Sequence, residues 1–338
     1  MIEATNNAAH WFHFRDMPKS EVAALLSANR RRSVVVAVTG TQRWFILGKN
    51  AGYDGRPKGA PVVPQETYWE EYRQAAGEQY VALLRLLFDH GIHTVFLPLL
   101  ANKARGRVYL EQVLHHLPQL LVGQEFQQLY KDLQVQVRFY GPYRSVLESL
   151  GIEETYQRMF TEAMVHKADD PAGKRRVFWG LVTPDADPDM EIAQCAVEHY
   201  RRTGTMPSRE QLVEALYGEQ VEPIDFMITG GKFQVLTYLP PMLRGQEDLY
   251  FIVNSPLGLT QGQLRAILFD NCYCRKCVDG NRPYQQFSPQ TLAEMKSLYD
   301  LNRESVVGVG RYHPEGKFWY PIPQVRLPEA LAREECNQ

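Results

Sequence analysis

The chain has 338 residues, which is long enough to bury a substantial hydrophobic core in one large domain or two ordinary ones. Its formal net charge is −2 and its sequence pI is about 6.5, so its surface has no bulk attraction for nucleic acid or an anionic membrane. It contains no apolar run of the roughly 18 residues that a membrane-spanning helix needs, and its first residues lack the pattern of a signal peptide. We therefore expect a cytoplasmic protein with no nucleic-acid partner and no integral membrane segment.

Apolar segments of helical spacing alternate with runs of β-branched and aromatic residues along the whole chain. The predicted strands span residues 34–38, 93–100, 134–140, 175–182, 225–228 and 249–253. The predicted helices span residues 20–26, 66–90, 108–121, 124–132, 189–202, 208–217, 264–272 and 288–302. This alternation predicts an α/β fold with a mostly parallel sheet and helices on both faces. We expect a single domain over residues 1–325 and a flexible tail over 326–338.

The first predicted strand, residues 34–38, is apolar throughout, which suits a strand that is covered on both faces of a parallel sheet. The turn after it contains Gly40 and leads to Arg43. In open parallel sheets, ligands bind beyond the carboxyl ends of the strands, and the free N–H groups of a following helix favour an anion. We expect a phosphate-bearing ligand here, although the turn matches no standard phosphate-binding motif and an ordinary strand-to-helix turn is the alternative.

Residues 49–64 follow this turn and are rich in glycine and proline. Such a composition packs poorly and moves easily, so the segment is either a flap over the ligand or an inert surface insertion.

The five cysteines are too few, and odd in number, for a disulfide framework. Cys272, Cys274 and Cys277 are close enough in sequence to suggest zinc, but structural zinc sites need four ligands and usually take them from spaced pairs. We interpret the cluster as small thiols near a buried helix end and expect no residues that bind a metal directly.

The turn after the first strand also carries a resemblance. Its residues are Thr39, Gly40, Thr41, Gln42, Arg43 and Trp44. They resemble the Asp-Gly-Asn-Arg-Arg-Trp diphosphate-binding loop of cis-prenyltransferases, and more closely the Asp-Gly-Thr-Arg-Arg-Trp-Phe loop of tuberculosinol/isotuberculosinol (and kolavelool) synthases. The likeness continues through residues 71–76, 87–92, 105–109, 249–251 and 306–310, so it covers nearly the whole chain. It implies a cis-prenyltransferase fold, as in undecaprenyl diphosphate synthase.

The resemblance also implies roles for individual residues. It implies catalytic roles for Thr39, Tyr72 and Tyr109, and diphosphate binding by Gly40, Thr41, Gln42 and Arg43. Arg105 and Arg107, in a basic loop, are expected to supply the contact that is lost at Gln42. A tyrosine ring is a suitable wall for an allylic cation, and its hydroxyl can orient a water or take a proton through one. The alternative for Tyr72 is that it continues an apolar helical stripe.

Three departures from the family pattern change the expected chemistry. Thr39 stands where family members have an Asp, and a neutral hydroxyl replaces a carboxylate neither as a magnesium ligand nor as a base. We therefore expect Mg²⁺ to be carried with the diphosphate by few protein ligands, the alternative being substitute ligands at Asp54, Glu70 and Glu71. Ile228 and Gln234 replace arginines that hold isopentenyl diphosphate in cis-prenyltransferases, so chain elongation is not expected.

The function that the resemblance implies is that of a diterpene synthase. Such an enzyme would ionise a bicyclic diterpenyl diphosphate of halimane or clerodane type and quench the cation with water, which gives a tertiary alcohol. The alternatives are transfer of the diterpenyl group to a nucleoside-like nitrogen and a non-catalytic subunit that binds a prenyl diphosphate. The resemblance also implies a homodimer. Its apolar surface would come from Phe251, Ile252, Leu264, Ile267, Leu268 and Phe269, which could equally be intrachain core.

Overall fold

The computed structural model describes residues 7–28, 32–48, 66–100, 110–142, 147–148, 151–163, 175–181, 188–231, 242–275, 288–314, 318–322 and 325–326. The chain divides into two compact units. The larger comprises Lys19–Gly230 and Gln234–Leu259, and the smaller comprises Met1–Pro18, Gly231–Phe233 and Thr260–Gln338. The single domain over 1–325 stays a prediction, and almost all of the expected tail lies outside the described residues.

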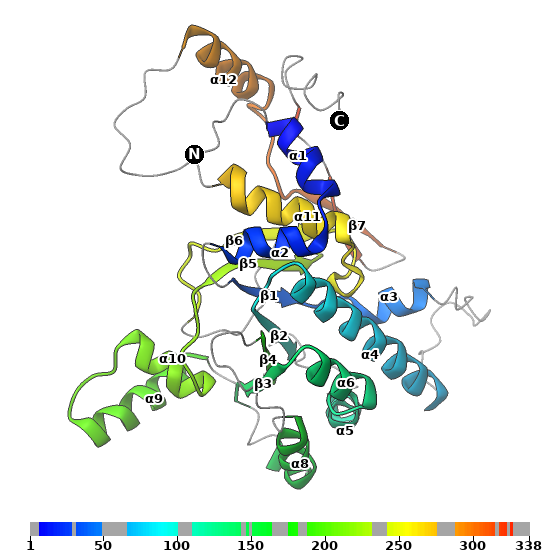
Figure 1. Ribbon diagram of the computed structural model, residues 1–338, viewed down its shortest axis with the longest axis vertical. Coiled ribbons are helices and arrows are strands. Elements are labelled where there is room, and N and C mark those ends of the chain that lie inside the picture. Colours follow the sequence, from blue (N-terminus) through cyan, green and yellow to red (C-terminus); the bar gives the residue numbers. More distant parts are fainter. Residues whose placement is uncertain are drawn as a thin grey trace. The chain divides into compact units, whose positions relative to one another are not determined.

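The larger unit is built on a six-stranded sheet with the order β3-β4-β2-β1-β5-β6 (Figure 1). All five pairs of neighbouring strands are parallel, which confirms the predicted fold class. The strands are β1 (Ser33–Ala37), β2 (Thr94–Leu100), β3 (Val135–Tyr140), β4 (Arg175–Leu181), β5 (Ile224–Gly230) and β6 (Asp248–Ile252). Because β1 lies between β2 and β5, the turn that follows it leaves the sheet at its centre.

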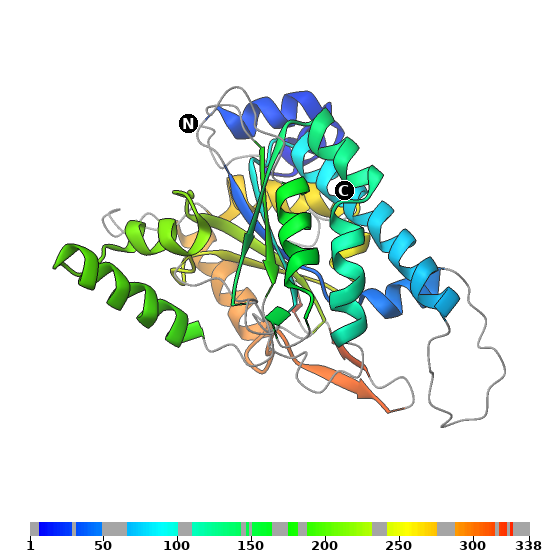
Figure 2. The same ribbon diagram turned by 90° about the horizontal axis from the view of Figure 1, so that it is seen from below.

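Helices cover both faces of this sheet. Figure 2 shows α4, α5 and α6 on one side and α9 and α10 on the other. The helices of the larger unit are α2 (Lys19–Ser27), α3 (Thr41–Gly48), α4 (Glu66–Asp89), α5 (Leu110–Leu121), α6 (Gln124–Asp132), α8 (Glu153–Ala163), α9 (Pro188–Thr203), α10 (Arg209–Tyr217) and the short η3 (Pro256–Gly258). None of the described helices is long and apolar enough to cross a membrane.

The two faces have separate cores, because successive side chains of a strand point to opposite faces. On one face, Val35 and Phe178 join a cluster that includes Tyr217 of α10. On the other face, the Trp179 ring meets the ring of Tyr80 from α4 at 5.8 Å between centroids, and Trp179 Nε1 donates a hydrogen bond of 3.2 Å to the Tyr130 hydroxyl of α6. Strand β1 is fully buried, as its apolar sequence predicted.

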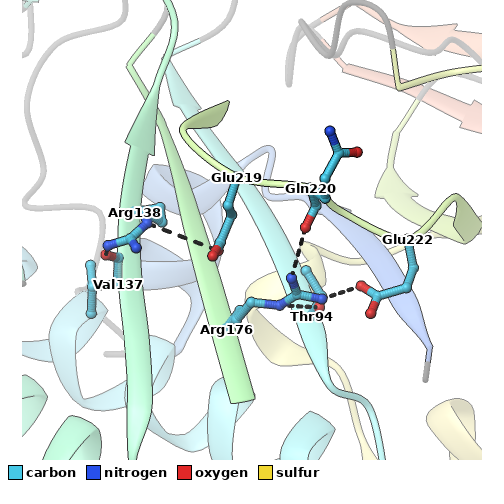
Figure 3. Close-up of polar contacts among 7 residues, drawn as sticks. All are labelled: Thr94, Val137, Arg138, Arg176, Glu219, Gln220 and Glu222. Carbon is cyan, nitrogen blue, oxygen red and sulfur yellow. Dashed lines mark hydrogen bonds and ion pairs between the residues drawn. The ribbon is translucent and has the colours of Figure 1, made fainter. Parts of the chain in front are cut away.

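Ion pairs occupy the amino ends of the strands. Arg176, near the start of β4, donates from Nε to Thr94 Oγ1 at 3.1 Å and from Nη1 to the Gln220 carbonyl oxygen at 3.1 Å, and it also pairs with Glu222 (Figure 3). These contacts bind the start of β2 and β4 to the segment that precedes β5. The same edge holds a second pair at the start of β1.

That second pair joins Arg32 to Asp225 and is almost fully enclosed, with side-chain exposures of 2% and 1%. Arg32 Nη1 lies 3.4 Å from Asp225 Oδ1, while Asp225 Oδ2 accepts a hydrogen bond of 3.0 Å from the Ser33 backbone N–H. A buried charge costs several kcal/mol when its partner is removed. The pair therefore fixes β5 beside β1 at the amino edge.

The smaller unit consists of helices and a two-stranded antiparallel hairpin. Its elements are α1 (Asn7–Asp16), α11 (Gln261–Phe269), η4 (Asp270–Cys274), α12 (Pro289–Leu301), β7 (Gly310–His313) and β8 (Phe318–Pro321). Arg265 of α11 donates to the carbonyl oxygens of Phe14 at 2.9 Å and Arg15 at 2.7 Å, so it stabilises the carboxyl end of α1. Helix α1 was not predicted, and the predicted helix 264–272 is instead an α-helix that ends at Phe269 and continues as a π-helical turn.

Residues proposed as dimer surface lie mostly inside this unit. Leu264 and Leu268 are fully buried in the single chain, and Ile267 and Phe269 are also buried. The intrachain alternative therefore holds for these four residues. Phe251 is half-buried, and a homodimer stays a prediction.

We expect Asp225→Ala to lower the free energy of unfolding by about 3–5 kcal/mol, because the buried Arg32 guanidinium would lose this carboxylate partner and the Ser33 N–H would lose this acceptor. Urea denaturation followed by circular dichroism measures this. Asp225→Asn, which keeps an acceptor for the Ser33 N–H, should lose less. A loss below about 1 kcal/mol for the alanine variant would show that water reaches the pair.

Candidate functional site

The candidate site begins where β1 gives way to α3. Gly40, just before the helix, has a φ of +70°, a conformation that other residues adopt only with strain. The Trp44 N–H donates to the Gly40 carbonyl oxygen at 3.0 Å, which closes the first turn of α3. The N–H groups of the three residues before Trp44 belong to the first turn and have no acceptor within the helix. Together with the helix dipole they favour an anion at this point.

The Arg43 guanidinium lies beside the same turn. A Cβ atom added at Gly40 would be 3.5 Å from Arg43 Nη2 and 3.9 Å from Nε. Arg43 and Gln42 are exposed to solvent, while Thr41 is half-buried. The structure therefore brings the loop glycine, the guanidinium and the first-turn N–H groups together, which is the arrangement that a diphosphate site requires. Their role in binding stays a prediction.

Thr39 is tied into the sheet. Its Oγ1 donates a hydrogen bond of 3.1 Å to the Gly230 carbonyl oxygen, and its own carbonyl oxygen accepts one of 2.6 Å from Ser255 Oγ. These bonds join the carboxyl ends of β1 and β5 to the segment that follows β6. At the position of the family's Asp, the chain thus has a hydroxyl that acts as a hydrogen-bond donor to the backbone.

The segment after β6 was not anticipated as part of the site. Gly230 permits its close approach, since a Cβ there would lie 2.7 Å from the Asn254 carbonyl oxygen and 2.8 Å from Pro256 Cδ. Ser255 is buried and also accepts from the Leu257 N–H. The available signal was the order Asn254, Ser255, Pro256 directly after a predicted strand, because polar turns at the carboxyl edge of a parallel sheet lie where ligands bind.

Tyr72 of α4 reaches this loop. Its hydroxyl oxygen lies 2.5 Å from Thr41 Oγ1, and its ring packs edge-on against Phe45 with centroids 5.5 Å apart. Tyr72 is half-buried, whereas Tyr80, two turns further along α4, is in the core. Burial raises the pKa of the Tyr80 hydroxyl, and the nearby Tyr72 adds to that rise, so Tyr80 stays protonated. Of these two tyrosines, Tyr72 is the one at the loop.

Several expected site residues are not in the part of the chain that the structure describes. Tyr109, Arg105 and Arg107 lie outside the described residues, and so do Gln234 and the segment 49–65 with Asp54. Their proposed roles, including the flap, stay predictions.

Of the expected substitute magnesium ligands, Glu70 and Glu71 lie among the described residues. Within them, no group of three His, Cys, Asp or Glu side chains could hold a metal. Glu70 is paired with Arg73, whose hydrogen bond lowers the pKa of that carboxyl, and Thr39 offers no carboxylate. Mg²⁺ carried with a diphosphate stays a prediction. Cys272 is buried and Cys274 exposed, while Cys277 lies outside the described residues, so the zinc question is also untested.

We expect Arg43→Ala to weaken binding of inorganic diphosphate by about 10- to 100-fold, because a charge-assisted hydrogen bond is worth about 1.5–3 kcal/mol. Isothermal titration calorimetry measures the change. Arg85→Ala is the matched control, since Arg85 pairs with Asp132 near the far end of α4. An affinity within threefold of wild type for Arg43→Ala would remove this residue from the site.

The comparisons with known proteins concern the family and the fold. No family model matches the chain. It is 30% identical over 305 residues to the tuberculosinyl adenosine transferase of Mycobacterium tuberculosis, which covers 89% of this chain and 95% of that protein. It is 27% identical over 271 residues to the (+)-kolavelool synthase of Herpetosiphon aurantiacus, covering 79% and 86% respectively.

A solved structure shows the same fold. The lavandulyl diphosphate synthase of Lavandula x intermedia, in complex with dimethylallyl diphosphate, superposes with a TM-score of 0.52 at 12% identity, over 79% of this chain and 98% of that one. At this identity the likeness concerns the fold alone. The match to the tuberculosinyl adenosine transferase shows the family as well, because it combines 30% identity with coverage of 89% of this chain and 95% of that protein. The chain therefore belongs to the family of the tuberculosinyl adenosine transferase and kolavelool synthase, proteins of the cis-prenyltransferase fold.

Proposed function

We propose that this protein is a diterpene synthase that ionises a bicyclic diterpenyl diphosphate of halimane or clerodane type. It releases diphosphate and quenches the allylic cation with water to give a tertiary alcohol. Membership of this family supports an enzyme that acts on a prenyl diphosphate. The more specific proposal, ionisation followed by quenching with water, rests on the Tyr72 hydroxyl. Its oxygen lies 2.5 Å from Thr41 Oγ1, directly beside the candidate diphosphate loop.

The loop provides what ionisation needs. As the bond between carbon and oxygen breaks, the leaving diphosphate gains negative charge, and donors already aimed at it lower the barrier. Arg43 and the first-turn N–H groups of α3 are such donors. The half-buried Tyr72 ring has an electron-rich face that can stabilise the positive fragment, and the buried Phe45 ring packs against it.

The sheet argues against chain elongation. Ile228 occupies the position of an arginine that holds isopentenyl diphosphate in cis-prenyltransferases, and it is fully buried within β5 between Val36 and Tyr250. A buried aliphatic side chain contributes no charge-assisted hydrogen bond to a second diphosphate. A single allylic substrate is therefore the simpler proposal.

Transfer of the diterpenyl group to a nucleoside is the second candidate. The relative with the higher identity is the one named a tuberculosinyl adenosine transferase, at 30% against 27% for the kolavelool synthase. A nitrogen nucleophile would then take the place of water at the same cation.

One experiment separates these functions. Purified protein is incubated with geranylgeranyl, copalyl-type and kolavenyl-type diphosphates, with and without adenosine, and the products are analysed by mass spectrometry. A tertiary alcohol from a bicyclic substrate, unchanged by adenosine, is the expected result. An adenosine adduct would favour the transferase. Binding of diphosphates with no turnover would indicate a non-catalytic subunit.

The metal requirement is expected to be weak. Since Thr39 contributes no carboxylate, we propose that Mg²⁺ acts as a counterion of the substrate and that Arg43 and the α3 N–H groups hold the leaving group. Turnover in EDTA should therefore fall by less than about tenfold. Complete loss in EDTA, together with loss in Asp54→Ala or Glu71→Ala, would favour substitute carboxylate ligands.

A carboxylate restored at residue 39 should alter this behaviour. Thr39→Asp should increase the dependence on Mg²⁺ or change the product ratio without abolishing turnover. It should also lower stability by about 1–3 kcal/mol, because the Gly230 carbonyl oxygen loses its donor. Thr39→Ser, which keeps the donor, is the control. A wild-type protein that is inactive on every diphosphate, with activity only in Thr39→Asp, would instead indicate lost catalysis.

A further inference from the structure

Two hydroxyl groups join the diphosphate loop to the long helix α4. Thr41 Oγ1 and the Tyr72 hydroxyl oxygen are 2.5 Å apart, a short hydrogen bond between neutral groups. Both side chains are half-buried, and Phe45 packs edge-on against the Tyr72 ring, which restricts its orientation. Thr41 is the first residue of α3, so its hydroxyl lies at the helix end that favours an anion.

The loop itself contains no group that could act as a base. Residues 39–43 include no carboxylate. The Thr39 hydroxyl is engaged as a donor to the Gly230 carbonyl oxygen at 3.1 Å. A tyrosine hydroxyl has an ordinary pKa of about 10, so it is protonated near neutral pH and cannot keep a proton from water. An aliphatic hydroxyl ionises even less readily. A proton that is lost when water attacks a cation therefore needs a different final acceptor.

We propose that the Thr41 and Tyr72 hydroxyls form a proton relay from the attacking water to the leaving diphosphate, which acts as the base. The proposal rests on the proposed function. The diphosphate is the anion that the reaction itself produces, and it would be held at the turn to which Thr41 belongs. The relay gives this protein a route for the proton that does not need the carboxylate missing at residue 39.

The atoms balance in a single exchange. The bond between the allylic carbon and the diphosphate oxygen breaks, and its electron pair leaves with the diphosphate. A lone pair of water forms the new carbon–oxygen bond. The proton released by that oxygen passes to the Tyr72 hydroxyl oxygen, Tyr72 gives its own proton to Thr41 Oγ1, and Thr41 gives its proton to a diphosphate oxygen. The products are the alcohol and protonated diphosphate, and both side chains end as neutral hydroxyls.

The test compares alcohol formation with diphosphate release in the same reaction. In Tyr72→Phe and Thr41→Val the share of released diphosphate that is matched by alcohol should fall at least about tenfold, with hydrocarbon elimination products in its place. The double variant should be no worse than either single one, because both changes interrupt one chain. Thr41→Ser keeps the hydroxyl and should restore the alcohol share to within threefold of wild type.

A structural role would give a different pattern. Circular dichroism and binding of inorganic diphosphate show whether each variant is folded with an intact loop. Under the relay, wild type shows a solvent deuterium isotope effect on the alcohol share, and Thr41→Val abolishes it. If Tyr72→Phe and Thr41→Val keep the wild-type alcohol share, or change only KM, the relay is wrong while the proposed function stands. If wild type releases no diphosphate, the proposed function fails and the relay falls with it.

Discussion

The candidate site depends on a junction of three strand ends that are distant in sequence. Thr39 donates to the Gly230 carbonyl oxygen at 3.1 Å and accepts from Ser255 Oγ at 2.6 Å, so β1, β5 and the segment after β6 meet at one residue. Each such partly buried hydrogen bond contributes about 1 kcal/mol net, and leaving its groups unpaired would cost more. The junction fixes the point from which α3 starts. Donors at the first turn of α3 are then positioned before any ligand arrives, which reduces the cost of binding.

The two edges of the sheet are used differently. At the amino edge, the buried pair of Arg32 and Asp225 and the contacts of Arg176 satisfy charged groups with partners inside the chain. At the carboxyl edge, the polar groups of the junction are hydroxyls and backbone carbonyls, and the charge of Arg43 is exposed. The candidate anion site therefore lies at the carboxyl edge. This follows from the parallel arrangement, which gathers all helix amino ends that succeed strands on the same side.

Local pattern was enough to predict the parallel sheet and most of the helices around it, although α1 and α8 were not predicted. The apolar run in β1 predicted a strand buried on both faces, and the helices predicted over 208–217 and 264–272 begin with capping boxes at Ser208 and Thr260. Helix α1 escaped prediction because its sequence shows no clear apolar stripe. Its carboxyl end is stabilised by Arg265, about 250 positions away. An apolar pattern also cannot distinguish a dimer surface from core, which is why Leu264 was open to both interpretations.

The site was predictable only in part for the same reason. The resemblance indicated Arg43 and Tyr72, but the bond between Tyr72 and Thr41 depends on how α4 packs against α3. The tie between Thr39 and Gly230 joins residues 191 positions apart, which no local motif encodes. The same hydrogen bond shows why a carboxylate would fit poorly at residue 39. A carboxylate at residue 39, in this backbone, would face a carbonyl oxygen at hydrogen-bond distance, and two acceptors repel. The change from Asp to Thr is thus coupled to the position of β5. The hydroxyl of residue 39 is thus already engaged with the backbone at the end of β5.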